Sequence, residues 1–240
     1  MRSLALAAAI AGAATPLWAQ SLSVSLGDGG SLTTRTVELF ALITVLSLAP
    51  GLAMMVTCFP FIVTVLSILR QALGLQQAPP NMLIVSLALF MTYFVMEPVF
   101  LHAWAQGVKP LIDGAIGMDV AFTRGIAPFR TFMAGRIDSA TFDALRALRP
   151  DIGAGVSAQE APLSVLIPTF MLSEVQRAFA IGFVIYLPFL IIDMVVSAVL
   201  MSMGMMMVPP AMVSLPFKLG FFVVANGWAL VSGALVRSYF

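Results

Sequence analysis

The chain has 240 residues, of which 60% are hydrophobic and 10% are charged, and its mean hydropathy is +1.03. These values exclude a soluble globular domain and predict an integral membrane protein. The net charge of +1 argues against nucleic acid or an acidic surface as the main partner. Cys58, the only cysteine, lies inside an apolar run, so the sequence provides neither an intrachain disulfide nor a thiolate metal cluster.

The first residues are typical of a cleavable secretory signal. Arg2 is its basic residue, Leu4–Ala14 is an apolar run too short to span a bilayer, and Ala19 suits the position before the cleaved bond. We predict a signal peptide over residues 1–19, followed by a polar linker over residues 20–36 that is rich in Ser, Gly and Thr. Cleavage would leave the mature N-terminus outside the cell membrane.

A first apolar helical hairpin is predicted over residues 37–104. Its first part, Val37–Leu69, is too long for one straight span. Pro50 and Pro60 each remove a helical hydrogen bond, which favours a kink or a break within this part. A polar turn then precedes the second span, Met82–Trp104.

Residues 105–161 are predicted to form a small polar helical subdomain on the periplasmic side, outside the hydrocarbon. They contain six basic and six acidic residues, which is more than half of the charges in the chain. Phe129 and Phe132, and later Phe142 and Leu145, recur at helical spacing. This spacing predicts short amphipathic helices.

A second apolar hairpin is predicted over residues 163–240, with a methionine-rich loop at its turn. Its last apolar segment is interrupted by Pro216. Both predicted hairpins turn at a pair of prolines, Pro79-Pro80 and Pro209-Pro210, and these pairs follow equivalent helix ends. Gly74 is a candidate C-cap for the helix before the first turn.

The methionine-rich loop, Leu200–Pro210, carries five of the sixteen methionines within seven positions. Methionine is unbranched and polarizable, so its side chain can fill irregular gaps and repack around different shapes. The loop is therefore either a deformable seal or an apolar turn that faces lipid. Composition alone leaves both interpretations open, because methionine is also common in hydrophobic cores.

The polar stretch Ser173–Arg177 interrupts the apolar pattern, and four charged residues lie within or beside the apolar segments: Glu174, Arg177, Asp193 and Lys218. An ionisable side chain in a bilayer costs about 3 kcal/mol on insertion scales, so it usually faces a partner or a water-filled interior. We expect Glu174 or Asp193 to pair with Lys218, within one chain or between copies. A structural ion pair that orients subunits and a proton-relay or ion-coupling role for Asp193 are both open.

Nothing in the sequence indicates an enzyme. His102 is the only histidine and lies beside Trp104, at a position typical of a membrane edge. Without a second histidine or clustered carboxylates there is no zinc site, and without a base near a serine there is no catalytic triad. No glycine-rich phosphate loop is present. We expect no cofactor and no metal.

The basic residues fit four ordinary membrane spans poorly. With the N-terminus outside, four spans would leave the charged subdomain outside and the methionine loop inside, although that loop has no Lys or Arg. This arrangement contradicts the positive-inside rule. Either the orientation is unusual, or the apolar segments are not conventional lipid-embedded spans. The prolines and the charges within the segments favour the second interpretation.

Several longer motifs carry a resemblance to a known family. The chain resembles the FliP/SctR family of type III secretion export-gate proteins over about residues 37–240, and the cleavable signal is similar to that of its flagellar branch. The matching stretches are Leu46-Ser-Leu-Ala-Pro50, Leu66-Ser-Ile-Leu-Arg-Gln-Ala-Leu-Gly74, Gln77-Ala-Pro-Pro-Asn81, Leu87-Ala-Leu-Phe90, Ser173-Glu174, Ile181-Gly-Phe183, Pro188-Phe-Leu-Ile-Ile-Asp193, Val199-Leu-Met-Ser-Met-Gly-Met-Met-Met-Val-Pro-Pro210 and Ser214-Leu-Pro-Phe-Lys218.

The resemblance implies a pentameric ring that assembles with FliQ and FliR, beside FlhB, at the centre of the flagellar basal body. This gate would pass unfolded export substrates across the bacterial inner membrane, and it would sit largely outside the bilayer plane. The implied residues fall into three groups. They are a pore gasket of Met205, Met206 and Met207, an inter-subunit ion pair of Glu174 and Lys218 with Asp193 as a further acid, and the basic residue Arg130 of the polar subdomain.

Two functions therefore follow from the sequence. The first is a non-enzymatic, pore-forming subunit of a protein-export gate, in which apolar side chains close around the cargo. The alternative is a small proton- or ion-coupled secondary transporter, with Asp193 and Lys218 near the midplane of helices broken by prolines. A transporter should work as one or two copies, whereas a gate subunit should be inert without its partners.

Overall fold

The computed structural model describes residues 32–75, 78–153, 155–205 and 207–240, which form helices and no strand. Two helical stretches, Asn81–Ile112 and Leu163–Ser202, are long and apolar enough to cross a membrane, and up to four spans result if each bent helix pair counts as one. The prediction of an all-α membrane protein is therefore confirmed. The predicted signal peptide lies outside the described residues, as does most of the predicted linker.

Helix α2 (Leu32–Met55) begins before the predicted first apolar segment, so the last residues of the predicted linker are helical. The chain divides at Ser47 into two units, and the first of them contributes the N-terminal part of α2. Pro50 lies inside this helix without ending it. The break comes at the turn before α3 (Phe59–Ala72), where Pro60 occupies the first turn of the new helix. There a missing N–H removes no intrahelical bond.

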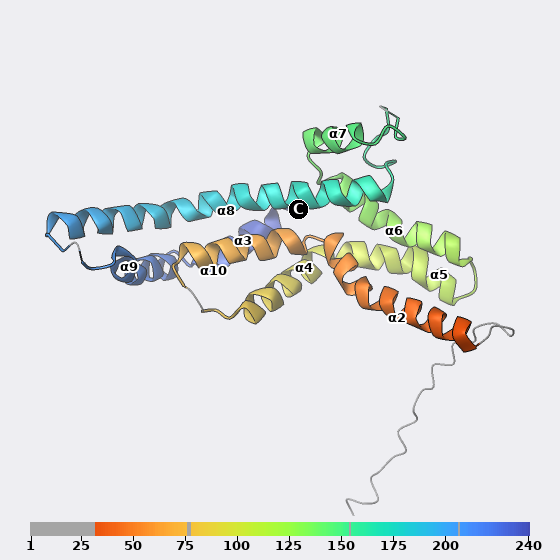
Figure 1. The fold of residues 1–240 in the computed structure, drawn as a ribbon, viewed down its shortest axis with the longest axis horizontal. Coiled ribbons are helices and arrows are strands. Elements are labelled where there is room, and N and C mark those ends of the chain that lie inside the picture. Colours follow the sequence, from red (N-terminus) through yellow and green to blue (C-terminus); the bar gives the residue numbers. More distant parts are fainter. Residues whose placement is uncertain (1–31, 76–77, 154, 206) are drawn as a thin grey trace, which may run out of the picture. The chain divides into compact units, whose positions relative to one another are not determined.

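Two helix ends share one hydrogen-bonding pattern, and both precede a Pro-Pro pair. After α3, Gly74 adopts a φ of +78°, and Leu75 N donates to Arg70 O at 3.4 Å. After α8 (Leu163–Ser202), Gly204 adopts a φ of +76°, and Met205 N donates to Leu200 O at 3.0 Å. This left-handed glycine ending confirms the C-cap predicted at Gly74. The ends of α3 and α8 point the same way in Figure 1.

The predicted polar subdomain contains the expected short helices. Helix α4 (Asn81–Ala103) continues through a π-helical turn at Trp104–Val108 into the short helix α5 (Lys109–Ile112), and α6 (Met118–Ala134) and α7 (Ser139–Ala147) follow. The π-helical turn packs closely on α6, because a Cβ atom at Gly107 would lie 2.7 Å from the Cα of Gly125. Only glycine permits this approach.

Two places where the sequence interrupts the apolar pattern of the second hairpin do not interrupt its helices. The polar stretch Ser173–Arg177 does not interrupt the 40-residue helix α8, and its two buried polar side chains, Ser173 and Glu174, form bonds within the protein. Pro216 lies inside α9 (Pro210–Val224) without breaking it. The bend comes instead at Asn226, with a φ of 51°, and α10 (Gly227–Arg237) leaves at 62° to α9.

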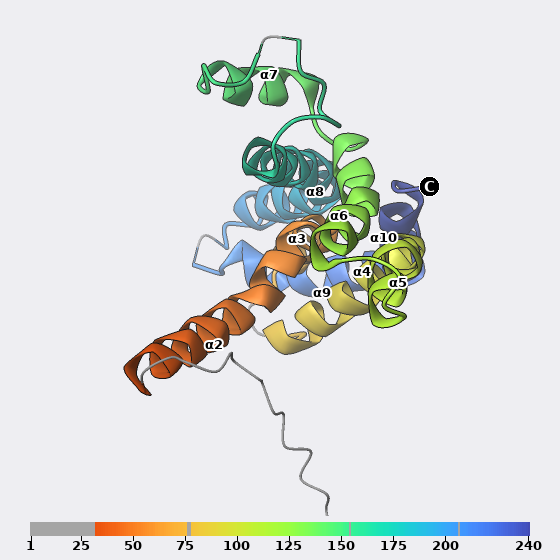
Figure 2. The ribbon, with the colours of Figure 1, turned by 90° about the vertical axis from the view of Figure 1, so that its right-hand side faces the viewer.

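Helix α3 lies at the centre of the residues 48–240 unit and packs against both α4 and α8. Figure 2 shows α3 between these two helices, with α10 beside α4. The hydrophobic core follows from its sequence, since one side of α3 is apolar at three- and four-residue intervals. The buried residues on that side are Phe61, Ile62, Val65, Leu66, Leu69 and Ala72.

Candidate functional site

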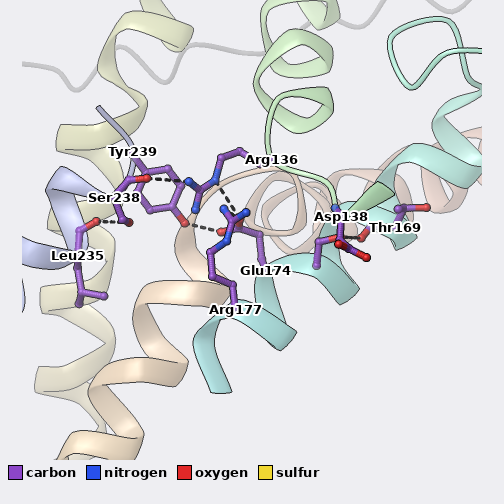
Figure 3. A network of polar contacts seen from close by, with 9 residues as sticks. Arg136, Asp138, Thr169, Glu174, Arg177, Leu235, Ser238 and Tyr239 are labelled. Atoms are coloured by element: carbon purple, nitrogen blue, oxygen red, sulfur yellow. Dashed lines mark hydrogen bonds and ion pairs between the residues drawn. The ribbon is translucent and has the colours of Figure 1, made fainter. Parts of the chain in front are cut away.

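The first polar cluster surrounds Glu174, which lies in the first third of α8 and whose side chain has no exposed surface. Its Oε1 atom accepts a hydrogen bond from Arg136 Nε at 3.1 Å. Arg177 Nη1, one turn further along α8, lies 3.7 Å from the same oxygen. The Tyr239 hydroxyl donates to Oε2. Figure 3 shows the three side chains converging on the carboxylate.

Arg136 and Tyr239 also contact each other. The guanidinium carbon of Arg136 lies 4.0 Å from the centre of the Tyr239 ring, a cation–π contact. Arg136 Nη1 donates to Ser238 O at 2.7 Å. The ring itself packs edge-on against Phe61 of α3 and stacks on Phe132 of α6. The residues after α10 therefore join α3, α6 and α8 around one buried carboxylate.

A smaller set of bonds connects this part of α8 to α7. Ser173 Oγ accepts from the backbone N–H of Asp138 at 2.9 Å. Asp138 is the N-cap of α7, and its carboxylate accepts from Thr141 N at 2.8 Å, as capping aspartates do. This hydrogen bond from the Thr141 backbone holds the pKa of Asp138 below its ordinary value.

The second polar cluster lies further along α8, at Asp193. Lys218 Nζ of α9 lies 2.6 Å from Asp193 Oδ2 and donates to Ala72 O at 3.1 Å. The Ser214 hydroxyl donates to Asp193 Oδ1 at 2.6 Å. The ammonium thus reaches a carbonyl in the last turn of α3, where the negative end of the helix dipole favours a cation. One side chain joins α3, α8 and α9.

These contacts give the four sequence-predicted charges specific partners within one chain. Asp193 pairs with Lys218, which is one of the two pairings expected from the sequence. Glu174 instead contacts Arg136 and Arg177. The inter-subunit pairing of Glu174 with Lys218, implied by the family resemblance, involves a second copy and stays a prediction. To form that pair, Glu174 and Lys218 would have to give up the partners that they have within the single chain.

Arg130 lies in α6 and contacts the segment that leads into α8. Its Nη1 atom donates to Gln159 O at 3.0 Å and to Ala161 O at 2.5 Å. Both carbonyls lie in the three residues before Pro162, which is the N-cap of α8. The basic residue predicted for the polar subdomain therefore fixes the start of the longest helix.

The methionine-rich turn lies between α8 and α9, far along α8 from Glu174. Met207 is 97% exposed, and Met201 and Met203 are also exposed. Met205 is at the edge of an apolar groove of about 540 Å³ between α8 and α9. Met206, the third predicted gasket residue, lies outside the described residues. Among the described methionines of the turn, most of the apolar surface is thus without a partner in the single chain.

Three residues of these clusters were not predicted from the sequence. Arg136 is one of six basic residues in a mixed-charge region, and nothing in the pattern distinguishes it from the others. Tyr239 follows the last helix and carries no periodic signal. Ser214 is detectable, because it precedes Lys218 by four residues and therefore shares its helix face.

Among the residues that the structure describes, no three His, Cys, Asp or Glu side chains gather as metal ligands. His102 is exposed and borders a shallow depression beside Gln106 and Thr131.

Comparison with known proteins identifies the family. The sequence model of the FliP family matches residues 42–235. A flagellar biosynthetic protein FliP from Caulobacter vibrioides is 49% identical over 97% of this chain and 88% of its own length. Proteins of the same name are 46% identical in Agrobacterium fabrum, over 88% and 86% of the two chains, and 45% identical in Bacillus subtilis, over 86% and 93%. The chain that carries the two polar clusters and the methionine turn belongs to the FliP family.

Proposed function

We propose that this chain is a pore-forming subunit of the flagellar type III protein export gate, which passes unfolded flagellar proteins across the bacterial inner membrane. In this proposal several copies, five by the family resemblance, form a ring with FliQ and FliR and beside FlhB. Family membership supports the flagellar setting, and the helices long and apolar enough to cross a membrane are compatible with an inner-membrane protein.

The observation that carries the proposal is the exposed methionine turn after α8. Its side chains are flexible and apolar, so they can close a narrow opening by excluding water and still yield to cargo of varied shape. One such turn cannot close a pore. A ring of identical turns can, because each copy places its methionines at an equivalent position around the axis.

The exposed surface of the helices supports self-assembly. Large apolar side chains on α4 and α8, among them Phe90, Phe94, Phe183 and Val184, are exposed in the single chain. Extended apolar surface of this kind marks contact with lipid or with other protein chains. In the proposal, neighbouring copies and partner subunits cover it.

The test of this function removes the gasket and leaves the rest of the chain intact. Deletion of residues 205–207 should raise the permeability of the membrane to small solutes, while the assembly keeps its native mass. The matched control is Met82→Ala, which removes an exposed methionine beside the turn of the other hairpin. Unchanged conductance in the deletion variant, with assembly intact, would contradict the gasket.

The secondary-transporter alternative draws support from one observation, the Asp193–Lys218 pair between two apolar helices. Intramembrane ion pairs are common on coupling-ion pathways. Mass measurement after detergent extraction separates the two functions. A stable monomer that moves a small solute would contradict the gate, whereas a large assembly that is inert in solute uptake would contradict the transporter.

A further inference from the structure

The carboxylate of Glu97 lies among apolar side chains. It lies on the exposed side of α4, and within the described ranges of the chain it makes no hydrogen bond or ion pair. Its neighbours along the same side of the helix, at positions i−7, i−4, i−3 and i+4, are large and exposed. They are Phe90, Tyr93, Phe94 and Leu101. We refer to these residues and Glu97 as the α4 stripe.

Arg177 on α8 is the opposite case, a cation with unused hydrogen-bonding capacity. Its only described ion pair is the 3.7 Å approach to Glu174, which is longer than a hydrogen bond. Glu174 already accepts bonds from Arg136 and Tyr239. The Arg177 side chain is 39% exposed, so part of the guanidinium faces outward.

Arg177 also stands at one end of an apolar surface. Positions i+7, i+14 and i+18 from it lie on the same side of α8, because the helix repeats every 3.6 residues. These positions are Val184, Ile191 and Val195, and all three are exposed. We refer to them and Arg177 as the α8 stripe. Each stripe thus combines exposed apolar side chains with one charge, and the two charges have opposite sign.

The apolar residues of both stripes are exposed in the single chain. Helix α3 packs against both α4 and α8, and Figure 2 shows it between them. The stripes therefore cannot cover each other within one chain. Two different surfaces that complement each other across copies produce a head-to-tail contact, which closes into a ring when the rotation permits.

We propose that the α4 stripe of one copy packs against the α8 stripe of the next, with Glu97 paired to Arg177 across the contact. The pair is needed because contact between the apolar side chains removes water from both charges, and an unpaired charge is unfavourable there. This inference rests on the proposed ring and assigns the residues of its repeating contact.

Disulfide crosslinking of the full-length chain in membranes tests the contact directly. A chain with both Glu97→Cys and Arg177→Cys should form a ladder of covalent oligomers after mild oxidation. Each single variant should form none, because the native Cys58 is fully buried. The matched control combines Glu97→Cys with Gln176→Cys. Gln176 is exposed but lies about 100° away from Arg177 around the helix. The ladder of this control should therefore be at least tenfold weaker.

A third set of variants distinguishes this inference from the proposed ring. Met205→Cys, in the turn that the ring would bring together, should crosslink to the same residue of another copy. A crosslinked dimer of the Met205→Cys variant without a Glu97–Arg177 ladder would overturn the stripe contact and leave the ring standing. Absence of both the Met205→Cys dimer and the Glu97–Arg177 ladder would overturn the ring and the contact together. A disulfide in the Glu97→Cys single variant would show a symmetric contact, which also overturns the proposal.

Removing the charge of Glu97 provides a second test of the contact. Glu97→Gln keeps the size of the side chain and removes its charge, so the fraction of chain in the large assembly should fall about thirtyfold. Glu160→Gln, which alters an exposed carboxylate of the polar segment, should leave that fraction unchanged. An unchanged fraction for Glu97→Gln would contradict the pair.

Discussion

The two carboxylates of α8 differ in how many parts of the chain hold them. Glu174 is fully buried and receives contacts from the segment after α6, from the residues after α10 and from its own helix. Asp193 is 37% exposed, and both of its described partners belong to α9, the next helix in sequence. The carboxylate in the first half of α8 is therefore held by distant segments, whereas the carboxylate in the second half is held by the next helix of the hairpin.

This difference separates a rigid region from an adaptable one. Most buried residues of α8 precede Phe183, and the following turns expose apolar side chains on several sides. Regions with few buried contacts open locally at lower free energy than the core. In the proposed gate, the methionine turn that yields to cargo would lie at the weakly held end of α8, while the other end keeps the protein folded.

The substitution Glu174→Leu should have the largest effect, and it tests whether the first half of α8 is the rigid region. The substitution leaves the buried Arg136 guanidinium without its carboxylate, so we expect a loss of about 3–5 kcal/mol in the free energy of unfolding. Denaturant unfolding in detergent measures it. The double variant with Arg136→Leu leaves no buried unpaired charge at this pair and should be more stable than Glu174→Leu alone. A double variant less stable than the single would refute the buried pair.

Tyr239→Phe should have the next largest effect. It removes one hydrogen bond to a charged acceptor and leaves the aromatic packing in place, which corresponds to about 1.5–3 kcal/mol. The same unfolding assay measures this loss. Phe132→Leu supplies a comparison, because it removes the stacked partner of the Tyr239 ring and keeps the hydroxyl bond. If Tyr239→Phe unfolds as the unmodified chain does, the hydroxyl does not stabilise Glu174.

Lys218→Met should have a smaller and more local effect. Water can reach the partly exposed Asp193 carboxylate, so we expect a loss of about 1–2 kcal/mol, below the range for a fully buried pair. Amide hydrogen exchange should show up to about thirtyfold faster opening of α9, with the first half of α8 unchanged. Lys218→Arg keeps the charge and serves as the control. Faster exchange throughout the chain would show that this cluster, too, belongs to the rigid region.

The smallest expected effect concerns pH. The pKa of Asp138 is lowered in the folded protein, so its capping contribution is complete above the ordinary aspartate value of about 3.9 and is lost as the pH falls through the folded value. Hydrogen exchange of α7, corrected for the intrinsic rate, should show this loss. Asp138→Asn retains a capping oxygen without a titrating group and should abolish the pH dependence. A dependence that persists in this variant would have to come from another group.

Much of the helical framework could be predicted from the sequence because it depends on local signals. Gly74 and the two Pro-Pro pairs mark turns through backbone geometry that any chain must obey. Pro60 marks the break before α3 for the same reason. Pro216 interrupts the apolar pattern but not α9, because a proline inside an apolar helix is tolerated when the surrounding packing holds the helix.

The polar clusters could be predicted only in part. Pairing of Asp193 with Lys218 follows from the cost of charge in an apolar segment together with their proximity along the hairpin. The partners of Glu174 could not be predicted, since Arg136 and Tyr239 are distant in sequence and reach it only through the tertiary fold. The polar stretch around Glu174 indicated a contact but not which residues would form it.

The bend at Asn226 makes α10 a spacer of fixed length. Its eleven residues set both the distance from the bend to Tyr239 and the direction in which that ring emerges. One residue inserted into α10 would rotate everything after it by about 100° and advance it by about 1.5 Å. The tyrosine hydroxyl would then point away from Glu174, although no residue of the cluster had changed. The length of α10, as much as its composition, therefore determines whether Tyr239 reaches Glu174.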